Sequence, residues 1–197
     1  MKEIILATNN SGKVKEIAEL LKQFDVEVKS LKDLELGEPI EDGKNFLENA
    51  TIKARYAFGR TGIPTLADDS GFCIDSMNDF PALCSARFIK AVGGHQEAFR
   101  VINECINPKD KSAHFITNMV FIYKDKNGNE VLKGFEGRID GKFSYPAKGE
   151  GGFGFDSVFI PDGYEKTFAE MPDVKVKISH RTRALNKFFD FFKNIND

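Results

Sequence analysis

The chain has 197 residues, of which 41% are hydrophobic and 29% are charged, and its formal net charge is −2. This length is enough for one sizeable core or two small lobes, and the composition is that of an ordinary globular protein. The balanced charge excludes the global basic field of a nucleic-acid binder, so we expect no nucleic-acid partner. No apolar run is long enough for a signal peptide or a membrane span, which predicts a cytoplasmic protein with no membrane partner.

In the first third of the chain, short apolar runs alternate with segments whose apolar residues repeat at helical spacing. Residues 3–8 are predicted to form a strand buried on both faces, and a turn over 9–12 leads into an amphipathic helix. Alternating valines predict a short strand over 26–30. An acidic loop is expected over 31–44, and alanines at helical spacing predict a second helix over 45–58.

A short apolar run over 63–66 is predicted to be a buried strand that leads into Asp68 and Asp69. Adjacent carboxylates at a buried strand end are costly, because like charges raise each other's pKa. Strand ends that face a crevice are where open α/β sheets keep their chemistry, and two carboxylates suit a hard cation such as Mg²⁺. We expect Ser70 and Gly71 to turn the chain sharply, and a plain surface turn is the alternative interpretation.

The rest of the chain predicts a mixed sheet and a final helix. The expected elements are an irregular stretch over 72–94, a helix over 96–106, strands over 113–124 and 130–138 joined by a hairpin turn at Asn127-Gly128, a strand over 157–160, and a helix over 179–195. Strand–helix alternation at both ends and antiparallel structure in the middle predict an α/β fold with a mixed sheet, in which residues 1–197 form one domain of two lobes.

The three cysteines, Cys73, Cys84 and Cys105, are an odd number at irregular spacing. Such spacing forms neither a disulfide framework nor a zinc-binding pattern. We therefore expect buried, reduced thiols.

The turn between the first strand and the first helix has the residues of a phosphate-binding loop. It consists of Thr8, Asn9, Asn10, Ser11, Gly12 and Lys13. Small residues that lead into a helix expose backbone N–H groups, which attract anions together with the helix dipole. A lysine in the first helical turn is disfavoured unless something negative binds there. The pattern resembles a Walker A loop only superficially, because Val14 stands where Ser or Thr would hold Mg²⁺. A plain strand–turn–helix junction is the alternative.

A second group of donors begins the final predicted helix. Ser179 suits the N-cap, and His180 and Arg181 then place donors at the positive end of the helix dipole. That position disfavours cations but suits an electron-rich ligand, and Lys175 adds to the local positive charge. In the alternative interpretation, Arg181 pairs with an acid such as Asp173.

A glycine-rich loop over 149–156 is the third candidate. Dense glycines let a backbone approach a ligand closely. Phe153 and Phe155, on either side of Gly154, offer flat faces on which a nucleobase can stack, and Asp156 can accept hydrogen bonds from ring N–H groups. Alternatively, the loop is flexible and its aromatic residues anchor it to the core.

The acidic loop supplies a fourth candidate. Glu41 could join Asp68 or Asp69 on a metal ion. Acidic loops are usually only solvated, so this signal is weak by itself.

Together these stretches resemble the non-canonical purine nucleoside triphosphate pyrophosphatases, the inosine triphosphatase or Ham1-like family. The matching pieces are Ala7-Thr8-Asn9-Asn10 with Lys13 and Glu16, Glu41-Asp42-Gly43, Phe46-Leu47-Glu48-Asn49-Ala50 with Lys53-Ala54, Ala67-Asp68-Asp69-Ser70-Gly71, Ser85-Ala86-Arg87, Gly152-Phe153-Gly154-Phe155-Asp156 and Ser179-His180-Arg181. Each piece is weak alone, but their shared order and spacing over nearly the whole chain are specific.

The resemblance implies a homodimer that hydrolyses ITP, dITP and XTP to the monophosphate and pyrophosphate with Mg²⁺. It implies a long twisted mixed sheet flanked by helices, with two lobes and a central cleft. It also implies that residues 8–13 hold the triphosphate and that Glu41 and Asp69 hold the metal. The implied catalytic residues are Asp69 as proton acceptor, Asp68, Lys13 and Lys53. The other implied substrate-binding residues are Ser70, Phe153, Gly154, Phe155, Asp156, Lys175, His180 and Arg181.

Hydrogen-bond chemistry explains how such a site could reject ATP. A 6-oxo purine presents an acceptor and a ring N–H, where adenine presents an amino donor and a bare ring nitrogen. Donors from His180 and Arg181, facing an acceptor such as Asp156, leave adenine unpaired. Sites of this kind discriminate by roughly 10⁴ or more.

One loop departs from the family pattern Gly-Gly-x-Pro-Gly-x-Tyr-Ser-Ala-Arg. Here Ala82 replaces a glycine and Cys84 replaces the tyrosine. If that glycine has a positive φ, the loop backbone must differ in this chain.

Other functions stay open at this point. A nucleotide-binding module without turnover would bind ITP and release no pyrophosphate. A P-loop kinase would produce ADP, but the Walker A pattern is incomplete. The Maf-like pyrophosphatases share a similar architecture, but their motifs differ from the Gly-Phe-Gly-Phe-Asp and Ser-His-Arg pieces.

Overall fold

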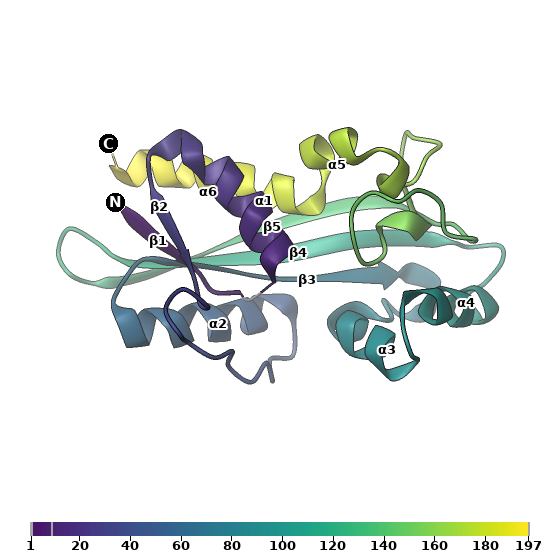
Figure 1. Cartoon of the computed structure of the whole chain (residues 1–197), viewed down its shortest axis with the longest axis horizontal. Helices are drawn as coiled ribbons and strands as arrows, with labels where there is room; N and C mark the ends of the chain where they lie inside the picture. The colour runs from purple at the N-terminus through teal and green to yellow at the C-terminus, as the bar shows by residue number, and fades with distance from the viewer. Residues whose placement is uncertain (1, 9, 197) are drawn as a thin grey trace. The chain divides into compact units, whose positions relative to one another are not determined.

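The computed structural model describes residues 2–8 and 10–196 (Figure 1). Its strands are β1 (Glu3–Leu6), β2 (Glu27–Ser30), β3 (Thr65–Ile74), β4 (Ser112–Lys124), β5 (Glu130–Phe143) and β6 (Phe159–Pro161). Its helices are α1 (Ser11–Leu21), α2 (Phe46–Thr61), α3 (Ser85–Ala91), α4 (His95–Cys105), α5 (Pro172–Ile178) and α6 (His180–Asn196). Within the described ranges, no helix combines the length and apolarity that a membrane span requires.

The six strands form one mixed sheet in the order β2-β1-β3-β4-β5-β6. β1 is parallel to β2 and to β3, with Ile5 opposite Thr65 in the second pair. β5 and β6 are antiparallel, with Gly141 opposite Pro161. The predicted α/β fold with a mixed sheet flanked by helices is confirmed.

The chain divides into two compact units. The first comprises Met1–Asp69, Asn118–Glu136 and Ala184–Asp197, and the second comprises Ser70–Thr117 and Gly137–Arg183. Three strands, β3, β4 and β5, contribute residues to both units. β3 passes from the first unit to the second between its two central polar residues, Asp69 and Ser70.

The first unit has a hydrophobic cluster on each face of its strands. In β1 and just after it, Ile4 and Leu6 pack with α1 and α6, whereas Ile5 and Ala7 pack with α2. Figure 1 shows α1 and α6 on one side of these strands and α2 on the other. Because strand side chains alternate between faces, β1 is apolar at every position that the two layers cover. The prediction of a strand buried on both faces is confirmed.

The second unit is built around a cluster of aromatic rings. Phe72 stacks on Phe155 with ring centroids 4.7 Å apart, and Phe115 meets the edge of Phe159 at 4.9 Å. α4 adds Phe99 to the same cluster. Such ring pairs stabilise a core beyond the area that they bury. Part of the chain's large phenylalanine content therefore fills this core.

β3 does not end at the paired aspartates. It continues through Ser70 and Gly71 to Ile74, so the expected sharp turn at these residues is wrong, as is the alternative of a surface turn. Phe72 and Ile74 are buried beyond the polar residues, which extends the apolar pattern past them. Tertiary burial therefore overrides the turn propensity of Asp, Ser and Gly.

The structure also revises the expectations for short elements and thiols. α3 and α5 have seven residues each, too few for a clear helical period, and the sequence did not predict them. All three cysteines are free, but only Cys73 is buried, whereas Cys84 and Cys105 are exposed. Burial raises the pKa of the Cys73 thiol to about 12. The expectation of buried thiols is therefore right for one cysteine and wrong for two.

Ala82 has a backbone φ of 44°, so alanine adopts the left-handed conformation in the loop that departs from the family pattern. A side chain in that conformation costs about 1–2 kcal/mol. We expect Ala82→Gly to raise the free energy of unfolding by about 1 kcal/mol, measured by urea denaturation.

Ala86→Gly is the matched control, because Ala86 lies in α3. There the same exchange is expected to lower the free energy of unfolding by about 0.5–1 kcal/mol. A loss of stability in Ala82→Gly would show that the left-handed alanine is not strained.

Candidate functional site

Asp68 and Asp69 on β3 each pair with a lysine from a different helix. Lys13 Nζ, in the first turn of α1, lies 2.8 Å from Asp68 Oδ2. Lys53 Nζ, on α2, lies 3.3 Å from Asp69 Oδ1. Successive strand side chains point to opposite faces, so each carboxylate reaches the helix that covers its own face. The two ammonium groups offset the repulsion between adjacent carboxylates.

Glu41 joins this arrangement through Lys53. Its Oε1 lies 3.3 Å from the same Nζ, although Glu41 stands in the loop before α2. Burial lowers the pKa of Lys53, but the carboxylates of Asp69, Asp68 and Glu41 together raise it above its usual value. The lysine is therefore charged at neutral pH. We call Lys13, Glu41, Lys53, Asp68 and Asp69 the acidic set.

Asn49 is a member of this site that the sequence did not single out. Its Nδ2 donates to Asp69 Oδ2 at 3.0 Å, and its Oδ1 accepts from the Gly43 N–H at 2.8 Å. A Cβ on Gly43 would lie 2.5 Å from that Oδ1, so glycine is needed for the close approach. Asn49 precedes Lys53 by four residues, and this spacing on one helix face was the available signal.

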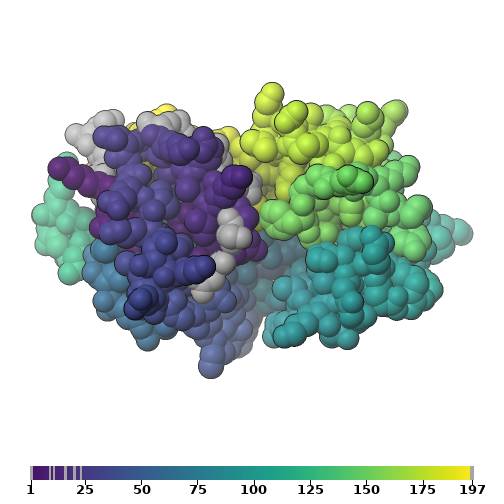
Figure 2. Space-filling view, viewed as in Figure 1, coloured from purple at the N-terminus to yellow at the C-terminus, as the bar shows by residue number. Residues whose placement is uncertain are grey.

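Through Asn49, the acidic loop is tied to Asp69. Figure 2 shows this loop, residues 31–44, in indigo on the surface of the first unit. Its tip is open to solvent, with Ile40 84% exposed. Glu41 therefore lies in an exposed loop, and the hydrogen bond between Gly43 and Asn49 fixes the end of that loop.

The α1 N-terminus is capped by the protein itself. Asn10 Oδ1 accepts hydrogen bonds from the N–H groups of Gly12 and Lys13, at 3.1 and 3.2 Å. Thr8 Oγ1 accepts from the Asn10 N–H at 3.2 Å. The N–H groups expected to meet phosphate thus already have an acceptor, which an anion would replace. The predicted residue Asn9 and the side chains of Ser11 and Glu16 lie outside what the structure describes.

Asp156 closes the glycine-rich loop of the second unit. Its Oδ2 accepts from Lys175 Nζ and from the Phe153 N–H, each at 2.7 Å. Gly152 has a φ of 79°, and a Cβ there would collide with the Asp156 carboxylate. The loop is therefore a turn fixed by a buried ion pair, which argues against the alternative of a flexible loop.

The two aromatic residues of this loop have different environments. Phe153 is 46% exposed, with Lys175 Nζ 4.5 Å and Arg181 Cζ 5.7 Å from its ring centroid. Phe155 is 3% exposed and stacks on Phe72. Only the Phe153 ring is open to a ligand, and Phe155 anchors the loop in the core. Between them, Gly154 has a φ of 63° and no neighbour within 4 Å of a Cβ position.

The start of α6 buries two further donors. Ser179 Oγ accepts from the Thr182 N–H at 3.1 Å, which agrees with its predicted N-cap role. Arg181 and His180 are 2% and 4% exposed, and the His180 ring stacks on Phe115 at 4.9 Å. We call Phe153, Asp156, Lys175, His180 and Arg181 the aromatic–cation set.

Ser70 is also in the second unit, where its Oγ donates to Thr117 Oγ1 at 2.8 Å. Ser70 follows Asp69 directly in β3. A residue of the acidic set and a predicted substrate-binding residue are therefore adjacent in the chain.

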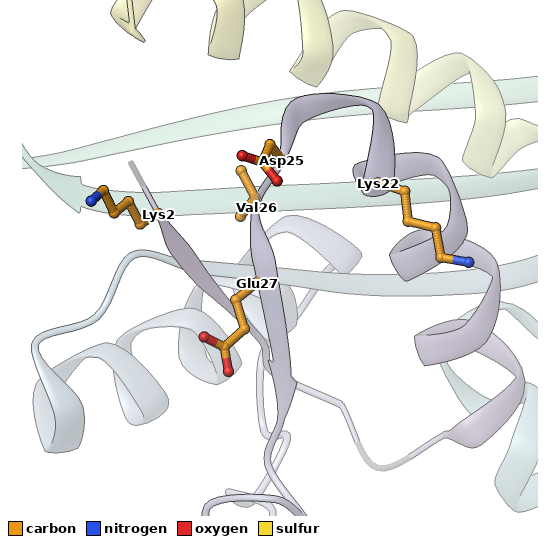
Figure 3. A pocket seen from close by; sticks show the side chains of 5 residues that line it. All are labelled: Lys2, Lys22, Asp25, Val26 and Glu27. Atoms are coloured by element: carbon orange, nitrogen blue, oxygen red, sulfur yellow. The ribbon is translucent and has the colours of Figure 1, made fainter.

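A surface hollow of about 550 Å³ lies elsewhere in the first unit. It is lined by Lys2, Lys22, Asp25, Val26 and Glu27 (Figure 3). None of these residues belongs to either set. The hollow therefore gives no independent support to the predicted site.

The sequence model of the Ham1 family matches residues 4–191. The dITP/XTP pyrophosphatase of Haemophilus influenzae is 39% identical over 188 residues, which cover 93% of this chain and 95% of that protein. The dITP/XTP pyrophosphatase of Zymomonas mobilis is 36% identical over 189 residues, which cover 93% and 88%.

The solved structures agree. A HAM1 protein from Coxiella burnetii has a TM-score of 0.88 and 32% sequence identity, and the match covers 98% of this chain and 100% of that one. This chain belongs to the Ham1 family. The resemblance drawn from the sequence is confirmed.

The charge of Lys53 is expected to stabilise the fold. Replacing it in Lys53→Met leaves Asp69 and Glu41 without their shared ammonium group, and we expect a loss of about 3 kcal/mol in the free energy of unfolding at pH 7. Because the pKa of Lys53 is raised in the folded state, its contribution is fully present below about pH 10.5 and is lost as the pH rises through the folded-state value. Urea unfolding of both proteins should give a constant difference from pH 7 to 10 that shrinks above this range.

Lys22→Met is the control, since Lys22 and Glu19 form an exposed pair. It should change stability by less than about 1 kcal/mol. Equal effects of the two substitutions would contradict the role of burial at Lys53.

Proposed function

We propose that this chain is a pyrophosphatase that hydrolyses ITP, dITP and XTP to the nucleoside monophosphate and pyrophosphate. The observation that carries this proposal is the acidic set, in which each of two adjacent aspartates pairs with its own lysine. The names of the relatives, which are dITP/XTP pyrophosphatases, support the choice of substrate. Residues 1–197 act in this proposal as one functional domain.

The charge balance of the acidic set supports a requirement for a divalent cation. Its two lysines and three carboxylates sum to −1, which repels a triphosphate; a divalent cation changes the sum to +1. Glu41 and Asp69 already place carboxylate oxygens around one cation, the Lys53 ammonium, and an oxygen-only donor set suits Mg²⁺. When bound, Mg²⁺ neutralises phosphate oxygens and acidifies coordinated water.

The side chains of the acidic set then have separate roles in hydrolysis. Asp69 accepts the proton of the attacking water, with Asn49 and Lys53 fixing its two oxygens. Lys13 leaves Asp68 for the phosphates and offsets their charge, as the first turn of α1 favours an anion there. The bond that breaks lies between the α and β phosphates, and water supplies the new oxygen.

The aromatic–cation set accounts for the choice of base. The exposed Phe153 ring offers a stacking face, while the buried donors of His180 and Arg181 suit the 6-oxo group of hypoxanthine or xanthine. The 6-amino group of adenine would bring a donor against donors. Asp156 supports this arrangement by fixing Lys175 and the Phe153 backbone.

From family membership we propose two further features. The enzyme works as a homodimer, and it acts in the cytoplasm on free nucleotides. The competing function, a nucleotide-binding module without turnover, leaves the aspartate–lysine pairs without a chemical role.

A nucleotide panel tests the activity directly. With Mg²⁺ present, pyrophosphate release from ITP, dITP and XTP is expected to exceed release from ATP by about 10⁴-fold in kcat/KM. ADP and phosphate among the products would indicate a different reaction, and equal rates on ITP and ATP would contradict the selectivity.

Asp69→Asn tests the proton acceptor. The amide keeps the size of the side chain but cannot accept the proton, so kcat should fall about 10³-fold while ITP still binds. Asp190→Asn, on the exposed face of α6, is the matched control and should retain the wild-type rate. Wild-type turnover in Asp69→Asn would assign the proton to another group.

Phe153→Ala tests the stacking face. Loss of one base–aromatic stack should raise KM for ITP and XTP alike by about 10-fold, with little change in kcat. Tyr164→Ala, which removes another exposed ring in the second unit, should leave KM unchanged. An unchanged KM in Phe153→Ala would place the base elsewhere.

A further inference from the structure

Three side chains from separate parts of the second unit bring a thiol, a carboxylate and an imidazole together. One ligand atom from each of Cys73, Asp79 and His114 lies within 4.8 Å of the other two. Cys73 and His114 are buried, and Asp79 is exposed. None of the three belongs to the acidic set or to the aromatic–cation set.

The strands explain why the thiol and the imidazole share a face. Cys73 follows Phe72 in β3, and His114 precedes Phe115 in β4; both phenylalanines pack in the aromatic core of the second unit. Because strand side chains alternate, Cys73 and His114 face away from that core. β3 and β4 are neighbours in the sheet. The two ligand groups are therefore placed by rigid strands.

A tight loop after β3 returns Asp79 to Cys73. The Asp79 N–H donates to the Ile74 carbonyl at 3.1 Å, and the Ile74 N–H donates to the Phe80 carbonyl at 3.1 Å. Pro81 then forms an isolated bridge with Cys73. Asp79 holds a left-handed φ of 63°, which a non-glycine residue adopts only when its surroundings fix it. The backbone of Asp79 is thus held close to Cys73 by these contacts.

A fourth residue orients the imidazole. His114 Nδ1 lies 2.9 Å from Asp75 Oδ1. A ring that donates from Nδ1 keeps its lone pair on Nε2, the atom that can bind a metal. A carboxylate behind the histidine is the usual outer partner of a metal-bound imidazole, and it fixes both the tautomer and the ring orientation.

We propose that Cys73, Asp79 and His114 form a binding site for a divalent transition metal of the zinc class, with Asp75 orienting His114. Sulfur, nitrogen and oxygen donors in this combination suit Zn²⁺ or Co²⁺ and not Mg²⁺, which prefers oxygen alone. Three protein ligands leave a fourth tetrahedral position for water or another ligand.

Binding closes the cluster and displaces a proton. A tetrahedral site with metal–ligand distances of 2.0–2.3 Å separates its ligand atoms by about 3.5 Å. This is below the 4.8 Å within which the three ligand atoms lie, so the side chains draw together on binding. The Cys73 sulfur binds as a thiolate, and its proton passes to the solvent. The site is independent of the acidic set, whose oxygen ligands select a different class of cation.

Cobalt substitution tests this proposal without using activity. Metal-free full-length protein is titrated with Co²⁺, and absorption reports a thiolate-to-cobalt charge-transfer band and the intense d–d bands of a tetrahedral site. We expect one equivalent of Co²⁺ to bind, Zn²⁺ to displace it, and excess Mg²⁺ to leave the spectrum unchanged. A folded wild-type protein without the charge-transfer band would overturn the proposal.

Variants identify the ligands. Cys73→Ser should abolish the charge-transfer band and His114→Gln should weaken cobalt binding at least 100-fold, with circular dichroism to confirm that each is folded. Asp75→Asn, at an exposed residue, should weaken binding about 10- to 100-fold with the band retained. The double variant Cys84→Ser/Cys105→Ser removes both exposed thiols as the matched control and should keep the wild-type spectrum. A band that survives in Cys73→Ser and disappears in the control would assign the metal to the exposed thiols and refute the site.

Discussion

The arrangement of this protein depends on how a buried strand tolerates two adjacent negative charges. In β3, Leu66 packs in the hydrophobic cluster of α1 and α6, and Ala67 packs in that of α2. The side chains of the next two residues also alternate between the two faces of the sheet, so Asp68 pairs with a lysine of α1 and Asp69 pairs with a lysine of α2. Consecutive carboxylates of β3 thus face two different helical layers, and each of them pairs with a lysine from its own layer. Replacing either lysine would remove the positive charge beside a carboxylate that is little exposed.

This pairing links stability to the proposed chemistry. In the proposed function, Lys13 neutralises Asp68 in the free protein and turns to the phosphates when Mg²⁺ at Glu41 and Asp69 changes the total charge of the acidic set from −1 to +1. The Asn10 cap follows the same logic at the α1 N-terminus, where an amide oxygen stands in for an anion. The free protein therefore satisfies internally the donors and charges that the triphosphate is proposed to satisfy. In the proposed function, substrate binding would exchange these partners and would not fill empty positions.

The sequence predicts the fold class, the main helices and most strands, because those elements are long and periodic. The predicted end of β3 is wrong, because Ser70 and Gly71 favour turns locally. Only packing against residues that are distant in the sequence extends the strand to Ile74. Most of the predicted site residues lie in one of the two sets, whose functional roles we propose. Sequence alone could not separate Phe153 from Phe155, because one glycine-rich pattern contains both an exposed ring and a core anchor. It also could not find Asn49 as a partner of Asp69, which requires the crossing of α2 and β3.

The inferred transition-metal site follows from the same strand. Cysteine spacing excludes a zinc pattern, yet a thiol on β3, an imidazole on β4 and a carboxylate on a returning loop meet without any local motif. If both proposed sites bind metal, the type of donor atom would separate the two cations. The carboxylates of the acidic set offer only oxygen and would suit a hard ion, whereas the proposed sulfur and imidazole ligands would suit a softer one. Because the two proposed donor sets differ in chemistry, Mg²⁺ would favour the oxygen ligands and a zinc-class ion would favour the thiolate and the imidazole, without steric exclusion from either site.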